Sequence, residues 1–260
     1  MKRIQLFEFE DRAWFPDWLR RCLTRLINVM HQFLGTPREL AVLISKMLIH
    51  SSQSKIIDLC SGSGGPMREV VKILKEEYGF KNLELTLSDL YPDQETARYI
   101  NQIRDNVTYV TIPVDATDVP PNLIGLRTMV GSFHHMAPDS AKKILVDAKE
   151  RKQAICIYEI SDNNLPIYLW WISLPLIFIM AFFITLFVRP LTWKQLLFTY
   201  LIPIIPFFFA WDGAVSNART YNLKDLDFLL DGLETDDYSW EKGKISGKGN
   251  KLYLIGMPRV

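Results

Sequence analysis

The chain has 260 residues, 48% of them hydrophobic, and a formal net charge of +1. This length suffices for one ordinary domain with a sizeable core and an additional segment. The near-neutral charge gives no reason to expect a nucleic acid as partner. The three cysteines, Cys22, Cys60 and Cys156, have neither metal-site nor disulfide-framework spacing, so a reducing cytoplasmic environment is expected.

The first predicted element is an amphipathic helix that begins at Pro16 and Asp17. Its apolar residues recur at helical spacing: Trp18, Leu19, Cys22, Leu23, Leu26, Met30, Phe33 and Leu34. Three arginines beside this face suit a helix that lies in an anionic membrane interface. The same pattern fits a helix that covers a sheet, and both alternatives stay open.

The segment from Lys55 to Leu74 has the pattern of a strand, a glycine turn and a helix. The apolar run Lys55-Ile56-Ile57 leads into Asp58-Leu59-Cys60-Ser61-Gly62-Ser63-Gly64-Gly65-Pro66, and a helix is predicted over 66–78. Glycines let the backbone approach a ligand closely, and free amides at the helix start favour a carboxylate or phosphate. The segment therefore predicts a pocket of the nucleotide-binding type.

Spacing separates the alternatives for this pocket. A Walker-type phosphate loop ends in Gly-Lys-Ser/Thr, but here Gly65 is followed by Pro66 and Met67. A dinucleotide fingerprint needs a small residue three positions after Gly64, where Met67 stands. The first alternative is excluded, and an NAD-type oxidoreductase is disfavoured but stays open.

The loop resembles the first motif of class I S-adenosylmethionine (SAM) dependent methyltransferases, an acidic residue followed by alternating glycines. Asp58, Gly62 and Gly64 fall on the matching positions, and Cys60 stands where that family usually has its first glycine. The resemblance implies an α/β fold, a Rossmann-like seven-stranded methyltransferase sheet with helices on both faces. It also implies SAM as the cofactor.

Acidic residues follow the next two predicted strands. Asp89 ends the strand over 83–88, about 25 positions after Gly64, where an acid can bind both ribose hydroxyls. The resemblance implies that Asp115, after the strand over 107–113, contacts the adenine amino group. The predicted cofactor-binding residues are Asp58, Cys60, Gly62, Gly64, Asp89, Leu90, Asp115 and Ala116. Acids at strand ends can also simply cap helices or turns.

Two further strands, over 126–133 and 153–160, flank a predicted helix over 138–149. Strands that alternate with helices indicate a largely parallel sheet covered on both faces. The segments 238–245 and 251–257 resemble the antiparallel end of a methyltransferase sheet.

An apolar insertion interrupts this pattern. Residues 165–188 carry no charge over about 24 positions, enough for a helix to span hydrocarbon, and 196–211 form a second uncharged run of about 16. Since strands lie on both sides of the insertion, it must leave and return on one side of a membrane. Two crossings and a hairpin within one leaflet both satisfy this condition, and a buried core hairpin is the disfavoured alternative.

The predicted organisation has four parts: an amphipathic helical segment (1–39), the SAM-binding Rossmann-like core (40–164), a hydrophobic membrane hairpin (165–211) and the C-terminal part of the sheet (212–260). The catalytic domain is expected on the cytoplasmic side of the membrane.

Two places in the chain offer catalytic groups. His134 and His135 follow the fourth strand, where an imidazole can serve as base near neutral pH. Asp212 follows the insertion and is the third catalytic candidate, while Arg219 and Tyr221 are candidates for substrate binding. The alternatives are packed or capping histidines, and a cluster that anchors the hairpin to the domain.

These features predict a membrane-associated SAM-dependent methyltransferase whose acceptor is an apolar small molecule or lipid, such as a quinone or isoprenoid. No metal is expected, and the oligomeric state stays open. The alternatives are an NAD-type oxidoreductase and a non-catalytic membrane adaptor that retains the fold.

Overall fold

A seven-stranded sheet forms the centre of the computed structural model, which describes residues 1, 3–12, 14–103, 105–163, 166–249 and 251–259. The strands are β1 (Lys55–Asp58), β2 (Glu84–Leu87), β3 (Val107–Tyr109), β4 (Leu126–Val130), β5 (Ile155–Glu159), β6 (Tyr238–Lys244) and β7 (Leu252–Pro258). Their order is β3-β2-β1-β4-β5-β7-β6. The pairs from β3 to β5 are parallel, and β7 runs antiparallel to β5 and β6. The predicted sheet and its antiparallel end are confirmed.

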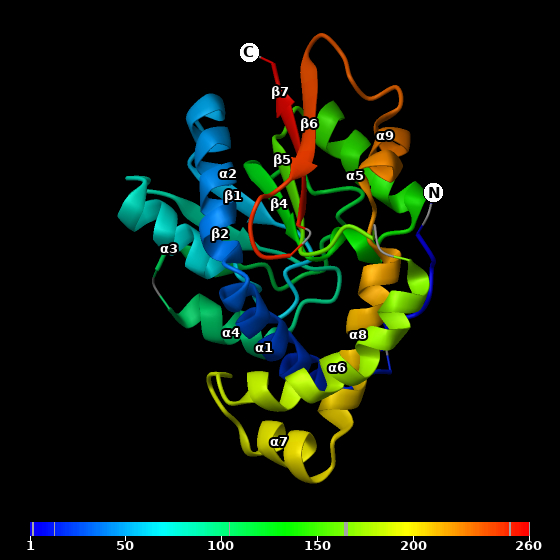
Figure 1. Cartoon of the computed structure of the whole chain (residues 1–260). Helices are drawn as coiled ribbons and strands as arrows, with labels where there is room; N and C mark the ends of the chain where they lie inside the picture. The colour runs from blue at the N-terminus through cyan, green and yellow to red at the C-terminus, as the bar shows by residue number, and fades with distance from the viewer. Residues whose placement is uncertain (2, 13, 104, 164–165, 250, 260) are drawn as a thin grey trace.

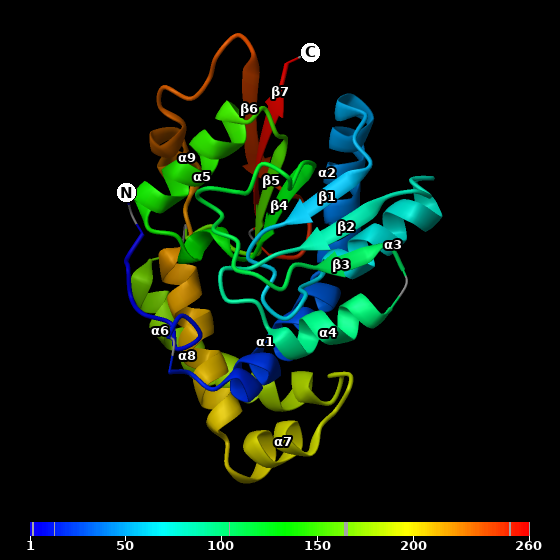
Figure 2. The same cartoon turned by 180° about the vertical axis from the view of Figure 1, so that it is seen from behind.

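Helices cover both faces of the sheet (Figures 1 and 2). The helices α2 (Thr36–Ser51), α3 (Met67–Glu77) and α4 (Gln94–Gln102) pack on one face, and α5 (Pro138–Glu150) and α9 (Leu223–Leu230) on the other. Neighbouring strand residues point to opposite faces, so Ile56 lies in the first apolar core and Ile57 in the second. This alternation leaves the carboxyl ends of the parallel strands as the edge where polar loops gather.

A third apolar core joins the N-terminal helix to the segment 166–211, here called the helical cap. The helical cap comprises α6 (Ile167–Thr185), α7 (Trp193–Leu196), the π-helix η2 (Leu197–Leu201) and the first half of α8 (Ile204–Arg219). The cap lies at one end of the molecule (Figure 1). In α1 (Asp17–Phe33), Leu23 and Leu26 are buried in the same core as Ile184 of α6 and Phe209 of α8. The apolar face of α1 therefore packs on the cap, a partner that neither sequence alternative named.

The predicted crossing of a membrane by 165–188 is not supported. Within the described residues, no single helix has the length and apolar character to cross a bilayer. The helices Trp193–Leu201 and Ile204–Arg219 are long and apolar enough only when they are taken together, and they are bent by 82° relative to each other. The predicted boundary at 164–165 lies outside the described residues.

The third and fourth strands end several residues before their predicted apolar runs do. The third ends at Tyr109 rather than 113, and the fourth ends at Val130 rather than 133. Gly131 turns the chain with φ of 60°, and the short 3-10 helix η1 (Phe133–His135) follows. The residues beyond each strand continue as loops at the edge that carries the predicted site.

Candidate cofactor and acceptor site

The loop between β1 and α3 depends on four residues with left-handed backbone. Cys60 has φ of 56°, Gly62 of 52°, Gly64 of 103° and Gly65 of 45°. This region is strained for a residue with a Cβ and accessible to glycine. Cys60 thus keeps the conformation that favours glycine at this position, so the departure from the family pattern preserves the turn.

Asp58 ties this loop to the sheet. Its buried carboxylate accepts hydrogen bonds from Thr128 Oγ1 at 2.6 Å and Ser61 Oγ at 2.7 Å. Burial raises the pKa of Asp58 to about 6, against the opposing effect of both hydroxyl groups. Asp58 therefore shapes the loop, and a direct contact with a cofactor stays a prediction.

Asp89, at the tip of β2, lies against the same loop. Its Oδ2 accepts a hydrogen bond from the Gly62 N–H at 2.8 Å, and its Oδ1 accepts one from the Tyr91 N–H at 2.8 Å. Each carboxylate oxygen has a second lone pair, so Asp89 can also accept ribose hydroxyls. Leu90, beside it, is partly exposed. Asp89 thus supports the glycine loop, and its predicted contact with the ribose stays a prediction.

Asp115 lies beside Asp89 because the Val114 N–H donates to the Asp89 carbonyl at 2.9 Å. Its Oδ1 accepts hydrogen bonds from the N–H and the hydroxyl of Thr117, both at 2.8 Å. Ala116 is buried. The strand order thus brings together the loop tips that the sequence assigned to one adenosine site.

Tyr109 is a support for the loop that the sequence analysis missed. Its hydroxyl donates to the Gly62 carbonyl at 2.6 Å. Tyr109 ends β3, which is separated from β1 by β2. No local pattern marks this tyrosine, because the contact exists only in the assembled sheet.

At the tips of β4 and β5, Glu159 orients His134. The Nδ1 atom of His134 is 2.8 Å from Glu159 Oε2, and the His134 backbone N–H donates to Glu159 Oε1 at 3.0 Å. Since a carboxylate only accepts, Nδ1 carries a proton, and Nε2 lies 3.9 Å from Glu8 Oε1. This Nε2 is buried without a hydrogen-bond partner among the described residues. The pair is held by the adjacent tips of β4 and β5.

His135 has different partners from His134. Its Nδ1 lies 2.7 Å from Asp11 Oδ1 and 3.6 Å from Glu8 Oε2. Burial favours a lower pKa for His135, but Glu8 and Asp11 outweigh it and raise the pKa to about 9. An imidazolium cannot accept a proton, so His134 is better suited than His135 to serve as a base.

Arg219 fastens the N-terminal segment, residues 3–12, over these histidines. Its buried guanidinium lies 2.6 Å from Asp11 Oδ2 and 3.1 Å from Glu8 Oε1, and it donates to the His135 carbonyl at 2.7 Å. Tyr221 donates to the carbonyl after η1 at 2.8 Å, and burial raises its pKa to about 12. These contacts match the alternative that the cluster anchors the cap, and substrate binding by Arg219 and Tyr221 stays a prediction.

Asp212 binds the backbone of the same N-terminal segment. Its carboxylate accepts hydrogen bonds from the Phe9 N–H at 2.8 Å and the Glu10 N–H at 3.2 Å. Burial raises the pKa of Asp212 to about 7 and that of Glu10 to about 8. The observed contacts give Asp212 a positioning role, and catalysis by it stays a prediction.

Glu8, His134 and His135 place three potential metal ligand atoms within 4.8 Å of one another. Imidazole nitrogens and carboxylate oxygens are suitable ligands for several divalent metals. A metal ion here would compete with Arg219 for Glu8 and with Asp11 for His135. Two of the three groups are thus already neutralised by side-chain partners.

The strand order and the glycine loop after β1 define the class I methyltransferase fold. The plantazolicin methyltransferase BpumL, in complex with a pentazolic desmethylPZN analogue and SAH, matches with a TM-score of 0.55 and 9% identity, over 94% of this chain and 99% of that one. Another BpumL structure with SAH matches with a TM-score of 0.51 and 10% identity, over 96% of this chain and 88% of that one. A Rhodobacter sphaeroides protein, provisionally described as a Zn-dependent alcohol dehydrogenase, matches with a TM-score of 0.53 and 12% identity, over 98% of this chain and 100% of that one.

At these identities the likeness shows the fold alone. No protein-family model matches the sequence, and no curated protein matches it. The chemistry must therefore be argued from the residues at the strand tips.

Proposed function

We propose that the chain is a membrane-associated SAM-dependent methyltransferase that methylates an apolar small molecule or lipid, such as a quinone or isoprenoid. The observation that carries the proposal is the meeting of the Gly62 loop, Asp89 and Asp115 at one edge of a class I methyltransferase sheet. The SAH in structures of the same fold supports the choice of cofactor.

When bound, SAM supplies a methyl group activated on a sulfonium. The chain must then hold the acceptor in line with that methyl and keep water out. The N-terminal segment suits the second task because it lies over η1, fixed by Asp212 and Arg219. Loops at the tips of β1 to β3 hold the cofactor in this proposal, and the β4 and β5 tips face the acceptor.

His134 is the residue we assign to activation of the acceptor. Glu159 fixes its ring, and the free Nε2 is the edge that can take a hydrogen bond from an acceptor hydroxyl. His135 and Arg219 instead neutralise the carboxylates of the N-terminal segment. The two adjacent histidines thus divide into one acceptor-facing and one structural group.

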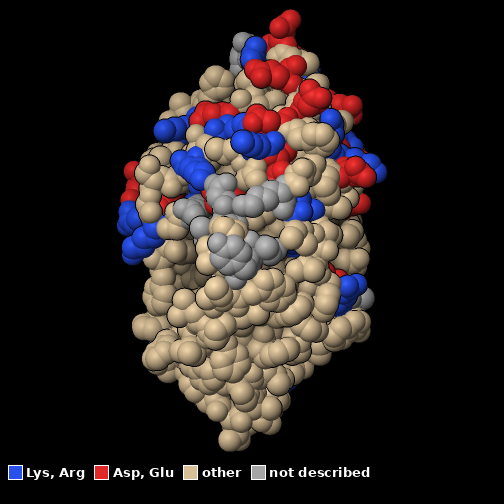
Figure 3. Space-filling model, turned by 45° about the vertical axis from the view of Figure 1, so that its right-hand side comes forward, with Lys and Arg blue, Asp and Glu red and all other residues tan. Residues whose placement is uncertain are grey.

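The exposed surface of the helical cap supports an apolar acceptor and attachment to a membrane. Figure 3 shows no Lys, Arg, Asp or Glu over most of the end formed by the cap. Exposed side chains there include Ile172, Leu176, Ile179, Phe183, Leu186, Phe187, Leu201, Ile202 and Phe207. Contiguous apolar surface of this extent is typical of membrane or partner binding sites. In this proposal the cap enters one leaflet and the sheet domain stays on the cytoplasmic side.

Calorimetric titration of the detergent-solubilised protein with SAH tests the cofactor site. Asp89→Ala removes the carboxylate for the ribose and the support of the Gly62 N–H. Charge-assisted hydrogen bonds contribute about 1.5–3 kcal/mol each, so the loss should exceed roughly tenfold. Asp118→Ala, which removes an exposed partner of Arg151, is the matched control.

Equal SAH affinity in both variants would contradict the assigned cofactor site. If a folded wild-type protein binds NAD but not SAH, the oxidoreductase alternative replaces the proposal. Binding of neither favours the adaptor alternative.

Vesicle co-sedimentation tests the membrane part. Phe183 of the cap and Phe228 of α9 are both 64% exposed, which makes them a matched pair. Burial of one large apolar side chain contributes about 1.5–3 kcal/mol, so Phe183→Ser should weaken vesicle binding at least about tenfold. Phe228→Ser should leave it unchanged. Equal effects of the two changes would contradict insertion of the cap.

A further inference from the structure

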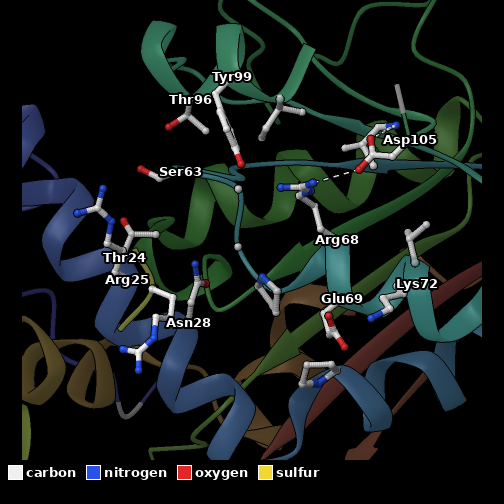
Figure 4. Close-up of a pocket in the computed structure, with 18 of the residues that line it drawn as sticks. Thr24, Arg25, Asn28, Ser63, Arg68, Glu69, Lys72, Thr96, Tyr99 and Asp105 are labelled. Carbon is white, nitrogen blue, oxygen red and sulfur yellow. Dashed lines mark hydrogen bonds and ion pairs between the residues drawn. The ribbon is translucent and has the colours of Figure 1, made fainter. Parts of the chain in front are cut away.

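A cavity of about 930 Å³ borders the glycine loop at Ser63, Gly64 and Gly65, and neither Asp89 nor Asp115 lines it. Figure 4 shows its walls, with Thr24, Arg25 and Asn28 from α1, Arg68, Glu69 and Lys72 from α3, and Thr96 and Tyr99 from α4. The turn at Arg189 and Pro190 closes the side toward the helical cap. Among the predicted cofactor-binding residues only Gly64 lines this cavity, so most of it is not accounted for by the proposed cofactor site.

Basic side chains outnumber acidic ones around this cavity. The basic residues are Arg21, Arg25, Arg68, Lys72, Lys75 and Arg189, and the acidic ones are Glu69, Glu76, Glu95 and Asp105. Two of these acids are already paired, since Glu95 lies 3.0 Å from Arg21 and Asp105 lies 3.0 Å from Arg68. The remaining charge around the cavity is positive.

Arg25 and Arg189 contribute charge that no acid neutralises within the described parts of the chain. Arg25 donates only to the Thr192 hydroxyl, at a long 3.4 Å. Arg189 donates to the carbonyls of Leu186 and Val188, at 3.1 Å and 2.8 Å. Neutral partners leave both guanidinium groups able to attract an anion.

These two arginines lie where the cavity meets the apolar surface. Only the buried Val188 separates Arg189 from the exposed Leu186 and Phe187, and Arg25 reaches Thr192 in the turn before α7. Cations beside an apolar surface are placed to meet headgroups while the apolar residues enter the acyl region. The cavity therefore opens at the level where lipid phosphates would lie if the cap enters a leaflet.

We propose that this cavity binds the phosphate-bearing headgroup of an anionic phospholipid, with Arg25 and Arg189 as the principal phosphate ligands. Guanidinium groups bind phosphate oxygens through paired N–H donors, and the lipid tails would then follow the apolar face of the cap. This inference rests on the proposed membrane association and adds the lipid class to it. It assigns these arginines to the membrane rather than to the methyl acceptor.

The test compares wild type with Arg25→Gln/Arg189→Gln on phosphatidylcholine vesicles and on vesicles that also contain phosphatidylglycerol. A basic residue near an anionic surface contributes about 1 kcal/mol, so the double variant should lose roughly 30-fold in its preference for phosphatidylglycerol. Binding to phosphatidylcholine alone should not change. Lys46→Gln/Lys143→Gln, which removes two exposed lysines outside the cavity, is the matched control for net charge.

Calorimetry with monomeric dihexanoyl-phosphatidylglycerol tests the cavity without a bilayer. We expect binding that dihexanoyl-phosphatidylcholine does not show and that the double arginine variant loses. Glycerol phosphate is the third ligand, and equal binding of it would show a site for free phosphate rather than for a lipid. Thermal unfolding of each variant confirms that it is folded.

Different results overturn different claims. If wild type binds phosphatidylcholine vesicles without preference for phosphatidylglycerol, the headgroup site is wrong and membrane association stands. If the wild-type protein binds no vesicle and no short-chain lipid, both the headgroup site and the membrane association are wrong. Equal losses in the lysine control would show long-range charge rather than a site. Weakened SAH binding with an intact lipid preference would assign the arginines to the cofactor.

Discussion

The proposed cofactor side and the proposed acceptor side of the sheet edge are built in different ways. On the cofactor side, Asp58, Asp89 and Tyr109 contact a loop from neighbouring strand tips, mostly through backbone groups. On the acceptor side, charged side chains from the N-terminal segment and α8 meet the histidines of η1. The first side is set by sheet topology, and the second is set by buried charge pairs. Substitutions should therefore affect the two sides differently.

The largest effect is expected at His134. Removal of a positioned acid or base typically costs 10²–10⁴ in rate, so His134→Ala should lower methyl transfer by about that factor. SAH affinity should not change, because the cofactor side does not use this residue. The measurement is transfer of labelled methyl from SAM into lipid extract, together with SAH titration.

His135→Ala provides the contrast. Its imidazolium compensates Asp11 and Glu8, so this change should lower stability more than it lowers the rate of the folded fraction. A rate loss in the His135 variant as large as in the His134 variant would remove the distinction between the two histidines.

The second effect is structural and falls on Arg219. Breaking a buried ion pair from one side costs about 3–5 kcal/mol, because the carboxylates of Glu8 and Asp11 lose their guanidinium. Arg219→Met should lower the free energy of unfolding by that amount in a denaturant titration. Arg38→Met breaks the exposed pair with Glu77 and should cost at most about 1 kcal/mol. Similar losses in the two variants would contradict the role assigned to buried charge.

The third effect is a pH dependence from Asp212. Its pKa is raised by burial to about 7 in the folded chain from 3.8, so the folded state binds more protons between these values. Its contribution to stability is therefore complete below about pH 4 and is lost as pH rises to about 7. The shift corresponds to roughly 4 kcal/mol at most.

Asp212→Asn should flatten the stability profile across this range, as measured by chemical unfolding at several pH values. Asp118→Asn, at an exposed site, is the control. An unchanged profile in the Asp212 variant would show that the carboxylate is ionised throughout.

The smallest effect is expected at Cys60, on the cofactor side. Its left-handed φ of 56° suits glycine, so Cys60→Gly should change the free energy of unfolding by less than about 1 kcal/mol and preserve SAH affinity. A β-branched side chain is strained there, and Cys60→Val should cost about 1–3 kcal/mol. Thermal unfolding and SAH titration of the pair measure both. A Cys60→Gly variant that loses SAH affinity would show that the thiol, rather than the backbone turn, matters.

The sheet and the cofactor side were predictable because each signal is local. Alternating apolar runs ended in Asp89 and Asp115, and the loop from Asp58 to Gly64 stood between a strand and a helix. The extra length predicted for the third and fourth strands was wrong, since apolar residues continue beyond the last ladder hydrogen bonds. The adenine and ribose contacts of these acids stay predictions.

The acceptor side and the cap were only partly predictable. His134 and His135 were found by their position after β4, but nothing near them in the sequence indicates Glu8 or Asp11, more than 120 positions away. Much of the predicted face of α1 is buried, although Phe33 is exposed, and its partner is the helical cap. An apolar periodicity shows that a face is buried and does not show against what.

The sequence by itself determined the strand segments, the glycine loop and the acidic residues at the strand ends, because each depends on residues that are neighbours in the chain. The tertiary structure alone decided that His135 is charged, which carboxylates are neutralised and where Arg25 and Arg189 meet the apolar surface. Those properties depend on distances between charges and on burial, and both arise only when distant segments pack together.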